Sequence, residues 1–325
     1  MSRWKKPKKD KDKRRRIVAE ALEYDLGKEI PQWASNLKNK ADKIMSGTYK
    51  RVYIYKNEAI SIEVNIPKEQ LARRLKIYDM LKKMPECNVN YPSEYFNLVF
   101  RNDNYYISKL RYCPLGDLFD KIMIMKDLEP YEELYRSYYM LHEAGLYHID
   151  VKPENLLVCK CGDNPIITIA IADIEDALIH TSDGVIKPKR VVRTRPYAPL
   201  MTLQAGKKYG FTRDMLAFCD YYAVSLILLI VYALDKETEE KDASDMVLNY
   251  QNNAIIPTRY LSFKNPPASV KMAQKMFNTQ TVFTEKVLRK IENMYGPNPV
   301  MKKPVKEKVK NFFRGMMGFK QKLKI

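Results

Sequence analysis

The segment YHIDVKPENLL, near the middle of the chain, concentrates side chains that can do chemistry. His148, Asp150, Lys152 and Asn155 follow a predicted helix and precede a predicted strand, and Asp173 ends a second apolar strand in IAIADIEDA. Phosphoryl transfer needs such groups: a carboxylate that orients the attacking hydroxyl, a cation near the phosphate, and an amide and a carboxylate that hold Mg²⁺. A polar turn could have the same composition, so the order and spacing of the neighbouring segments must decide.

The segments that would position these residues change character along the chain. Residues 51–55 (RVYIY) and 59–66 (AISIEVNI) are β-branched and aromatic and predict a hairpin. Residues 67–84 carry apolar side chains at helical spacing, and FNLVF and NYYISKL predict two further strands. After CPLGD the patterns are mostly helical. The sequence therefore predicts an α+β fold with a small β-rich lobe, a short connector and a larger, mainly helical lobe.

These segments together resemble the eukaryotic-type protein kinase family. HIDVKPENLL resembles the catalytic loop H-R-D-L-x-x-x-N, and ADIEDA resembles the Mg²⁺-binding D-F-G segment. The resemblance implies that Asp150 is the catalytic base, that Lys152 contacts the transferring phosphate, and that Asn155 and Asp173 hold Mg²⁺. A Lys two residues after the Asp is the Ser/Thr-kinase form, which implies transfer of the γ-phosphate of ATP to Ser or Thr hydroxyls of protein substrates.

The resemblance extends over about residues 41–235, in matching order. GTYKRVYIY resembles the Gly-rich loop and second strand, LRYCPLGDLFD the hinge between the lobes, TRPYAPL the end of the activation segment, and CDYYAVSLILL the helix whose Asp braces the catalytic loop. Asp117 could equally be a helix N-cap. The residues that the resemblance assigns to nucleotide binding are Gly47, Lys50, Val52, Arg111, Tyr112, Cys113, Asp117 and Leu157. Those that it assigns to supporting roles are His148, Thr194 and Asp220.

One departure concerns the lysine that normally binds ATP from the third strand. That strand reads AISIEV, so the place is taken by Glu63, or by Ile62 if the register slips by one. Lys50 stands in the Gly-rich loop instead, which is similar to the arrangement in the with-no-lysine kinases. A long, flexible ammonium could reach the same phosphates from there. The alternative is a catalytically weak or inactive pseudokinase that acts as a binding scaffold.

The helix after the third strand also departs from the family pattern. It offers basic residues near the place where the family has a Glu, namely Arg73, Arg74 and Lys76. We expect Glu63 to pair with one of them, as a charge-reversed version of the usual bridge. Three further replacements alter the activation machinery: Ile149 for an Arg, Ile174-Glu175 for Phe-Gly, and Leu200 for the Glu of A-P-E.

The charge of the chain is concentrated at its ends. Of the net +18, residues 1–16 carry +8 and residues 301–325 carry another +8, which leaves +2 for the body. A nearly neutral body argues against a nucleic-acid-binding fold. The basic ends could contact nucleic acid, an acidic protein or an acidic membrane surface, or could simply be solvated; the aromatic residues of the C-terminal end could also pack on the helical lobe. The expected divisions are a basic, disordered arm with a lead-in (1–40), the small lobe (41–112), the large lobe (113–298) and a tail (299–325).

Five scattered cysteines without a preceding signal sequence predict reduced thiols in an intracellular compartment, the cytoplasm or the nucleus. Cys159 and Cys161 form a lone C-x-C, for which a metal site is not expected. The longest apolar run covers residues 221–234, which is too short to cross a bilayer and predicts a buried core helix.

Overall fold

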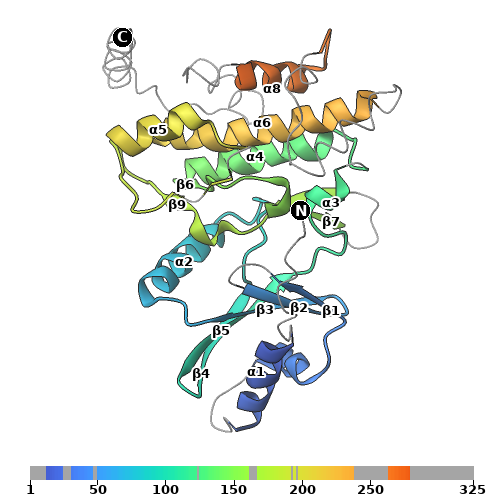
Figure 1. Cartoon of the computed structure of the whole chain (residues 1–325), viewed down its shortest axis with the longest axis vertical. Helices are drawn as coiled ribbons and strands as arrows, with labels where there is room; N and C mark the ends of the chain where they lie inside the picture. The colour runs from blue at the N-terminus through green and yellow to red at the C-terminus, as the bar shows by residue number, and fades with distance from the viewer. Residues whose placement is uncertain are drawn as a thin grey trace, which may run out of the picture.

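The computed structural model describes residues 12–24, 31–46, 50–122, 124–160, 167–191, 193–194, 197–237 and 263–278. In this part of the chain a lobe built on a β-sheet is followed by a lobe built mainly of helices, stacked one above the other in Figure 1. The predicted α+β, two-lobed fold is therefore confirmed.

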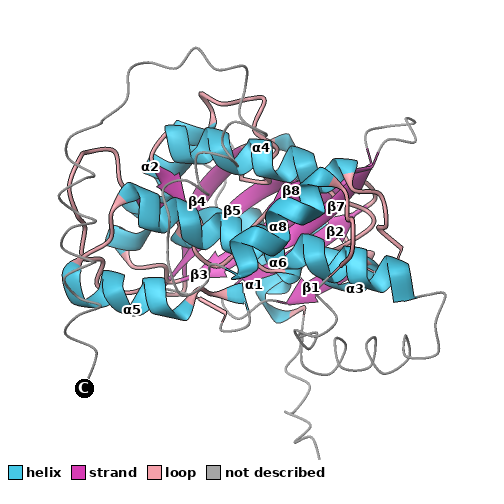
Figure 2. Cartoon of the chain, turned by 90° about the horizontal axis from the view of Figure 1, so that it is seen from above, coloured by secondary structure: helices cyan, strands magenta, loops and turns pink. Residues whose placement is uncertain are grey.

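The small lobe is a five-stranded antiparallel sheet with the strand order β1-β2-β3-β5-β4. The predicted hairpin joins β2 to β3, and the helix α2 (Lys68–Leu81) connects β3 to β4. Viewed from the helical end, in Figure 2, the helices of the large lobe lie in front of these strands. The strands are β1 (Lys43–Ser46), β2 (Lys50–Tyr55), β3 (Glu58–Val64), β4 (Glu94–Phe100) and β5 (Asp103–Arg111).

Part of the basic N-terminal segment is folded onto this sheet. Helix α1 (Lys13–Tyr24) and the 3₁₀ helix η1 (Gln32–Lys38) share a buried apolar cluster with the strands, and α1 lies below the sheet in Figure 1. Arg15 is buried, and its Nη1 donates to the carbonyl oxygens of Leu37 (3.0 Å) and Asn39 (2.7 Å). The expectation of a disordered arm is therefore wrong for residues 12–16, because the apolar face of α1 finds a partner in the sheet.

The large lobe contains four longer helices and two small two-stranded sheets in the described residues. The strands β7 and β8 pair with each other, as do β6 and β9. The helices are α3 (Leu118–Lys121), α4 (Glu129–Glu143), α5 (Leu200–Tyr209), α6 (Arg213–Glu237) and α8 (Ala268–Asn278), with 3₁₀ helices η2 (Pro153–Asn155) and η3 (Ile174–Asp176). The strands are β6 (Leu146–Tyr147), β7 (Leu156–Lys160), β8 (Ile167–Ile171) and β9 (Leu178–Ile179).

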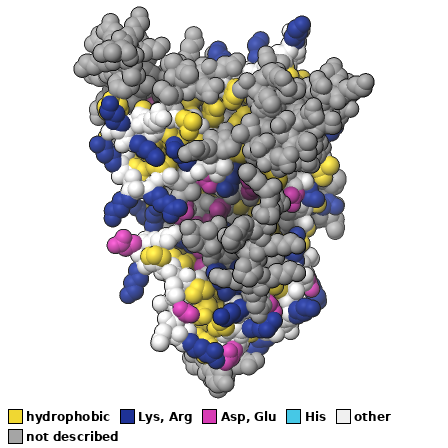
Figure 3. Space-filling view, in the orientation of Figure 1, with side chains coloured by type: hydrophobic (Ala, Val, Ile, Leu, Met, Phe, Trp, Pro, Cys, Tyr) yellow, Lys and Arg dark blue, Asp and Glu magenta, His cyan; other side chains and the backbone are white. Residues whose placement is uncertain are grey.

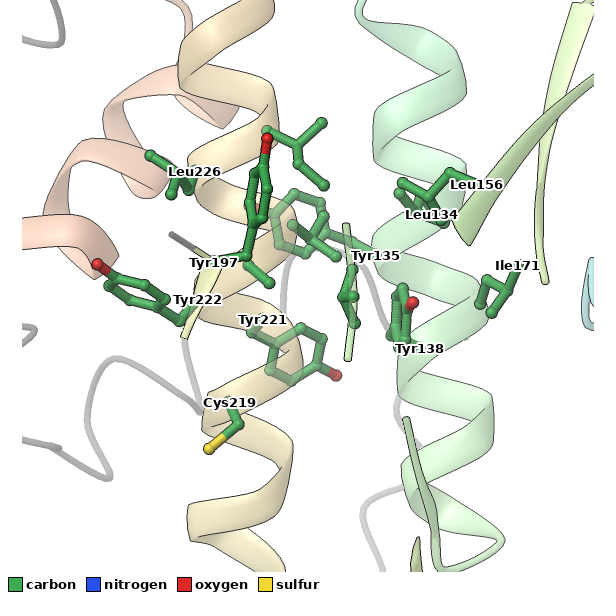
Figure 4. Packing of buried hydrophobic residues seen from close by; sticks show 14 of the residues in the cluster. Leu134, Tyr135, Tyr138, Leu156, Ile171, Tyr197, Cys219, Tyr221, Tyr222 and Leu226 are labelled. Atoms are coloured by element: carbon green, nitrogen blue, oxygen red, sulfur yellow. The ribbon is translucent and has the colours of Figure 1, made fainter. Parts of the chain in front are cut away.

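The core of this lobe is formed by α4 and α6, which present aromatic side chains to each other (Figure 4). The rings of Tyr135 and Tyr221 stack with centroids 6.1 Å apart. The Tyr135 hydroxyl bonds the Ser225 hydroxyl at 2.7 Å, so this buried polar group is satisfied. Because α6 is apolar on all sides, it is surrounded by protein rather than placed at the surface.

Helix α6 is longer than the apolar run that marks it in the sequence. Residues Arg213–Asp235 are long and apolar enough to cross a membrane by length and composition, but 94% of the most apolar window is buried inside the protein. The expectation of a core helix is confirmed by this burial, and not by the shortness of the run.

Two cysteines depart from the expectation of reduced thiols. Cys113, just after β5, and Cys159, on β7, form a disulfide with Cα atoms 4.5 Å apart. Cys87 and Cys219 are free and buried, while Cys161 lies outside the described residues. The sequence separation of 46 between Cys113 and Cys159 concealed this proximity, which arises because the connector between the lobes runs beside β7.

We predict that Arg15→Ala lowers the free energy of unfolding by about 1–3 kcal/mol, because one buried and one partly buried carbonyl group lose a charged donor. Chemical denaturation measures the effect. Arg16→Ala is the matched control, since this neighbouring side chain is 64% exposed and its removal should change stability by less than about 0.5 kcal/mol. Equal effects of the two substitutions would contradict the buried role of Arg15.

Candidate functional site

The loop between β6 and η2 carries the predicted catalytic residues and is anchored to α6. The carboxylate of Asp220 accepts the backbone N–H of His148 (2.9 Å) and of Ile149 (2.6 Å), and the His142 Nε2 lies 2.9 Å away. Asp220 is completely buried. Ile149 has φ 67°, which a β-branched residue adopts only when its surroundings hold it there. The predicted bracing role of Asp220 therefore has a direct structural counterpart.

Further contacts bring the catalytic loop to the end of β8. The His148 ring lies 2.8 Å from the carbonyl oxygen of Ala172, and the Ala172 N–H donates to the carbonyl oxygen of Asn155 at 2.8 Å. The Asn155 Nδ2 donates to the carbonyl oxygen of Asp150 at 2.9 Å. Asp173 directly follows Ala172, so these bonds place Asn155 and Asp173 on adjacent turns, as the sequence predicts.

Two other predicted residues contact the carboxylate of Asp150. The Thr194 hydroxyl donates to its Oδ1 at 2.8 Å, and the Lys152 Nζ lies 3.5 Å from its Oδ2. A Thr and a Lys from different segments thus converge on one carboxylate. The two contacts fix the orientation of the Asp150 carboxylate. They also place the Lys152 ammonium where it could face a phosphate.

Lys50 reaches this site from the small lobe. Its Nζ lies 2.8 Å from the Asp173 Oδ1 and 3.0 Å from the Glu175 Oε1. Burial alone would lower the pKa of Lys50, but the carboxylates of Glu175 and Asp173 raise that pKa above its ordinary value. Burial would likewise raise the pKa of Asp173, yet the nearby Lys50 ammonium holds it below its ordinary value. The two groups therefore form an ion pair at neutral pH.

Glu63 occupies the third-strand place, opposite Lys50 in the register of β2 and β3. Its Oε2 lies 2.8 Å from the Arg74 Nη1 on α2, and both side chains are buried. The expected charge-reversed bridge is confirmed, with Arg74 as the basic partner. Although burial opposes it, the Glu63 and Glu175 carboxylates raise the pKa of Arg74, so it stays charged.

The neighbouring residue on the same helix has a different task. The Arg73 Nη2 donates to the carbonyl oxygens of Asp176 (2.7 Å) and Ala177 (2.5 Å), and so ties α2 to the segment that follows Asp173. The sequence named Arg73 only as a candidate partner of Glu63. The sequence marks Glu175 only as the residue that replaces a glycine, although an acid in this position, together with a helix that lacks its usual Glu, is a signal of a new partner for Lys50.

The predicted nucleotide-binding residues lie around the connector. Val52 is on β2, Arg111 ends β5, and Tyr112 and Cys113 follow it. Leu157, on β7, pairs with Asp117. Asp117 is the N-cap of α3, its Oδ1 accepting the Asp120 N–H at 3.0 Å, so the capping alternative is confirmed. Burial raises the pKa of its carboxyl. Gly47 lies outside the described residues.

The donor groups suit a magnesium nucleotide. Asn155 uses its amide nitrogen on Asp150, which leaves its amide oxygen for a cation beside the carboxylate of Asp173. An amide and a carboxylate, completed by phosphate oxygens and water, are ligands that Mg²⁺ prefers. On the face drawn in Figure 3, acidic side chains show near the middle of the molecule, whereas Lys and Arg are spread over both lobes.

A separate cavity of about 670 Å³ lies near the connector and away from the catalytic loop. Its walls come from the segment after α2, from the segment before α4 and from the start of β8, with Ile124 and Ile167 among the lining residues. None of the residues assigned to catalysis lines this cavity.

Comparison with known proteins agrees with this geometry. The chain is 31% identical to the "Probable serine/threonine-protein kinase FMP48" of Saccharomyces cerevisiae over 141 residues, which is 37% of this chain and 38% of that protein. It is 26% identical to the mouse "Serine/threonine-protein kinase SBK1" over 193 residues, 56% of this chain and 44% of that protein. It is 29% identical to the "CBL-interacting serine/threonine-protein kinase 20" of Arabidopsis thaliana, over 42% of this chain and 35% of that protein.

No family model matches the chain. The matches to three named Ser/Thr kinases, together with the two-lobed fold, nevertheless support a distant relationship to the protein kinase superfamily. The matched regions span less than half the length of these relatives.

We predict that Asp220→Asn lowers the free energy of unfolding by about 2–3 kcal/mol and increases amide hydrogen exchange at His148 and Ile149, because the amide accepts with one oxygen where the carboxylate uses two. Asp235→Asn is the control: it lies on the same helix in a partly exposed pair with Lys126 and should have little effect. Unchanged protection of the two amides would contradict the bracing role.

We predict that Arg74→Met destabilises the fold by about 3–5 kcal/mol, because it leaves the Glu63 carboxylate buried without its partner. The double substitution Glu63→Leu with Arg74→Met removes both charges and should recover most of the loss. Thermal unfolding of the two variants measures this. A double variant as unstable as the single one would show that packing, and not the ion pair, sets the cost.

Proposed function

We propose that the protein is a Ser/Thr protein kinase that transfers the γ-phosphate of ATP to protein hydroxyls. The observation that carries the proposal is the convergence of Thr194 and Lys152 on the Asp150 carboxylate, next to Asn155 and Asp173. The named kinase relatives support the same reaction class.

Each residue has a role that follows from its position. Magnesium-bound ATP supplies the electrophilic phosphorus and the leaving group. Asp150 accepts a hydrogen bond from the Ser or Thr hydroxyl and orients its oxygen for attack. Lys152, beside Asp150, offsets the charge that develops on the phosphoryl oxygens. Asn155 and Asp173 offer the oxygens that hold the cation.

Lys50 is proposed to supply the cation that other kinases take from the third strand. Its ammonium lies within 3 Å of the Asp173 carboxylate, which is where a metal-bound triphosphate would have to be held. The register that places Lys50 opposite Glu63 explains how a residue of β2 reaches this position.

The competing function is a pseudokinase scaffold, and one observation favours it. Glu63 places a buried carboxylate where the family has its ATP lysine, and the Asp173 carboxylate is already engaged by Lys50. The basic ends would then serve partner binding, to nucleic acid, an acidic protein or an acidic membrane surface; most of these residues lie outside the described ones. An intracellular location, in the cytoplasm or nucleus, remains part of either proposal.

The test is transfer of labelled γ-phosphate from Mg-ATP to a generic basic protein. Asp150→Asn and Lys50→Met should each lower the rate at least about a hundredfold. Lys76→Met is the matched control for Lys50, because it removes an exposed lysine of α2 by the same chemical change and should leave the rate unchanged.

Each outcome discriminates between the candidates. Loss in Asp150→Asn alone would keep the kinase and overturn the assignment of Lys50. A folded wild-type chain that transfers no phosphate would overturn the kinase proposal in favour of the scaffold.

A further inference from the structure

The helix α2 offers no carboxylate to the site lysine. Arg74 is paired with Glu63, and Arg73 is bound to two carbonyl groups. The acidic residues of α2 are Glu69 and Asp79, both exposed, and Asp79 pairs with Lys82. A lysine that reaches the site from β2 therefore has to be held by another element.

Glu175 meets this requirement in its position and its burial. It is 9% exposed, and its Oε1 lies 3.0 Å from the Lys50 Nζ. Its other oxygen, Oε2, is buried without a hydrogen-bond partner among the described residues. The Lys50 ammonium therefore strongly stabilises the charged form of the buried Glu175 carboxylate, because water does not replace this contact.

The backbone around Glu175 is also held in place. It lies in η3, and Arg73 binds the carbonyl oxygens of Asp176 and Ala177, the two residues that follow. The side chain is therefore presented from a short turn that is fastened to α2. The contact between Glu175 and Lys50 would therefore persist if the Asp173 carboxylate turned away from Lys50 to bind a cation.

We propose that Glu175 is a positioning residue that holds the Lys50 ammonium at the phosphate site, in place of the helix carboxylate that Arg74 has displaced. The inference rests on the proposed kinase function for its catalytic consequence. Its structural part, a Lys50 ammonium held by Glu175, stands apart from that function and can be tested without nucleotide.

The first test measures the reactivity of the Lys50 amine in the nucleotide-free chain. The protein is treated with an amine-acylating reagent and the modification of each lysine is followed by mass spectrometry. An ammonium held by two carboxylates is shielded from the reagent, so the wild-type Lys50 should react slowly. Glu175→Gln removes one of the two contacts and should accelerate the modification of Lys50 at least about fivefold. Lys76 is the internal control and should react equally in both proteins.

The second test asks whether Glu175 acts through Lys50. Glu175→Gln should lower kcat/KM for Mg-ATP about tenfold in the wild type and have no further effect in Lys50→Met, because interacting residues are not additive. Glu175→Asp, one methylene shorter, should not restore the rate. Glu69→Gln is the matched control on an exposed acid and should leave kcat/KM unchanged.

The outcomes separate the two proposals. Unchanged Lys50 acylation in Glu175→Gln overturns the positioning role, whatever the activity. Independent, multiplying losses in Glu175→Gln and Lys50→Met overturn it as well. Faster acylation of Lys50 in a chain whose wild type transfers no phosphate supports the contact and overturns only the kinase function.

Discussion

The carboxylate of Asp220 is the group on which the arrangement of the catalytic loop depends. It is completely buried in α6, and it accepts two backbone N–H groups of the loop while lying beside His142. A buried charge is stable only when its hydrogen-bonding capacity is filled, so helix and loop need each other. The aromatic contacts between α4 and α6 fix the helix that carries this carboxylate, and so link the core of the large lobe to the geometry around Asp150 (Figure 4).

Between the lobes, the charges are arranged so that each one has an opposite neighbour. Glu63 contacts Arg74, while Lys50 contacts both Asp173 and Glu175. These five groups carry a net charge of −1, which favours a cation at the end of β8. The usual pair has its positive charge on the strand and its negative charge on the helix. Here Glu63 and Arg74 reverse both charges together, so the attraction between them is kept. A single exchange would leave one buried charge against a like charge.

The small lobe is stabilised by more than its five-stranded sheet. Helix α1 and η1 close one face of the sheet, and Arg15 joins the two through carbonyl groups of residues 37 and 39. The sequence predicts that the N-terminal positive charge lies on a disordered arm. One of these charges, that of Arg15, is instead buried in the folded protein. The rest of this positive charge lies on the exposed residues of α1 and on segments outside the described residues.

Four features could be read from the amino-acid sequence without the structure: the fold class, the hairpin of β2 and β3, the segment that carries Asp150 and Asn155, and the absence of a third-strand lysine. These follow from local patterns: side-chain alternation in strands, helical spacing, and polar groups in a fixed order. It also left the right alternatives open for Asp117 and for the partner of Glu63. The choice of Arg74, rather than Arg73 or Lys76, as the partner of Glu63 depends on tertiary packing. The rotation of α2 about its axis sets which of the three basic side chains points toward Glu63. The same holds for the contact of Glu175 with Lys50, the burial of Arg15 and the pairing of Cys113 with Cys159. Each joins residues far apart in the chain, and packing rather than local pattern sets their separation.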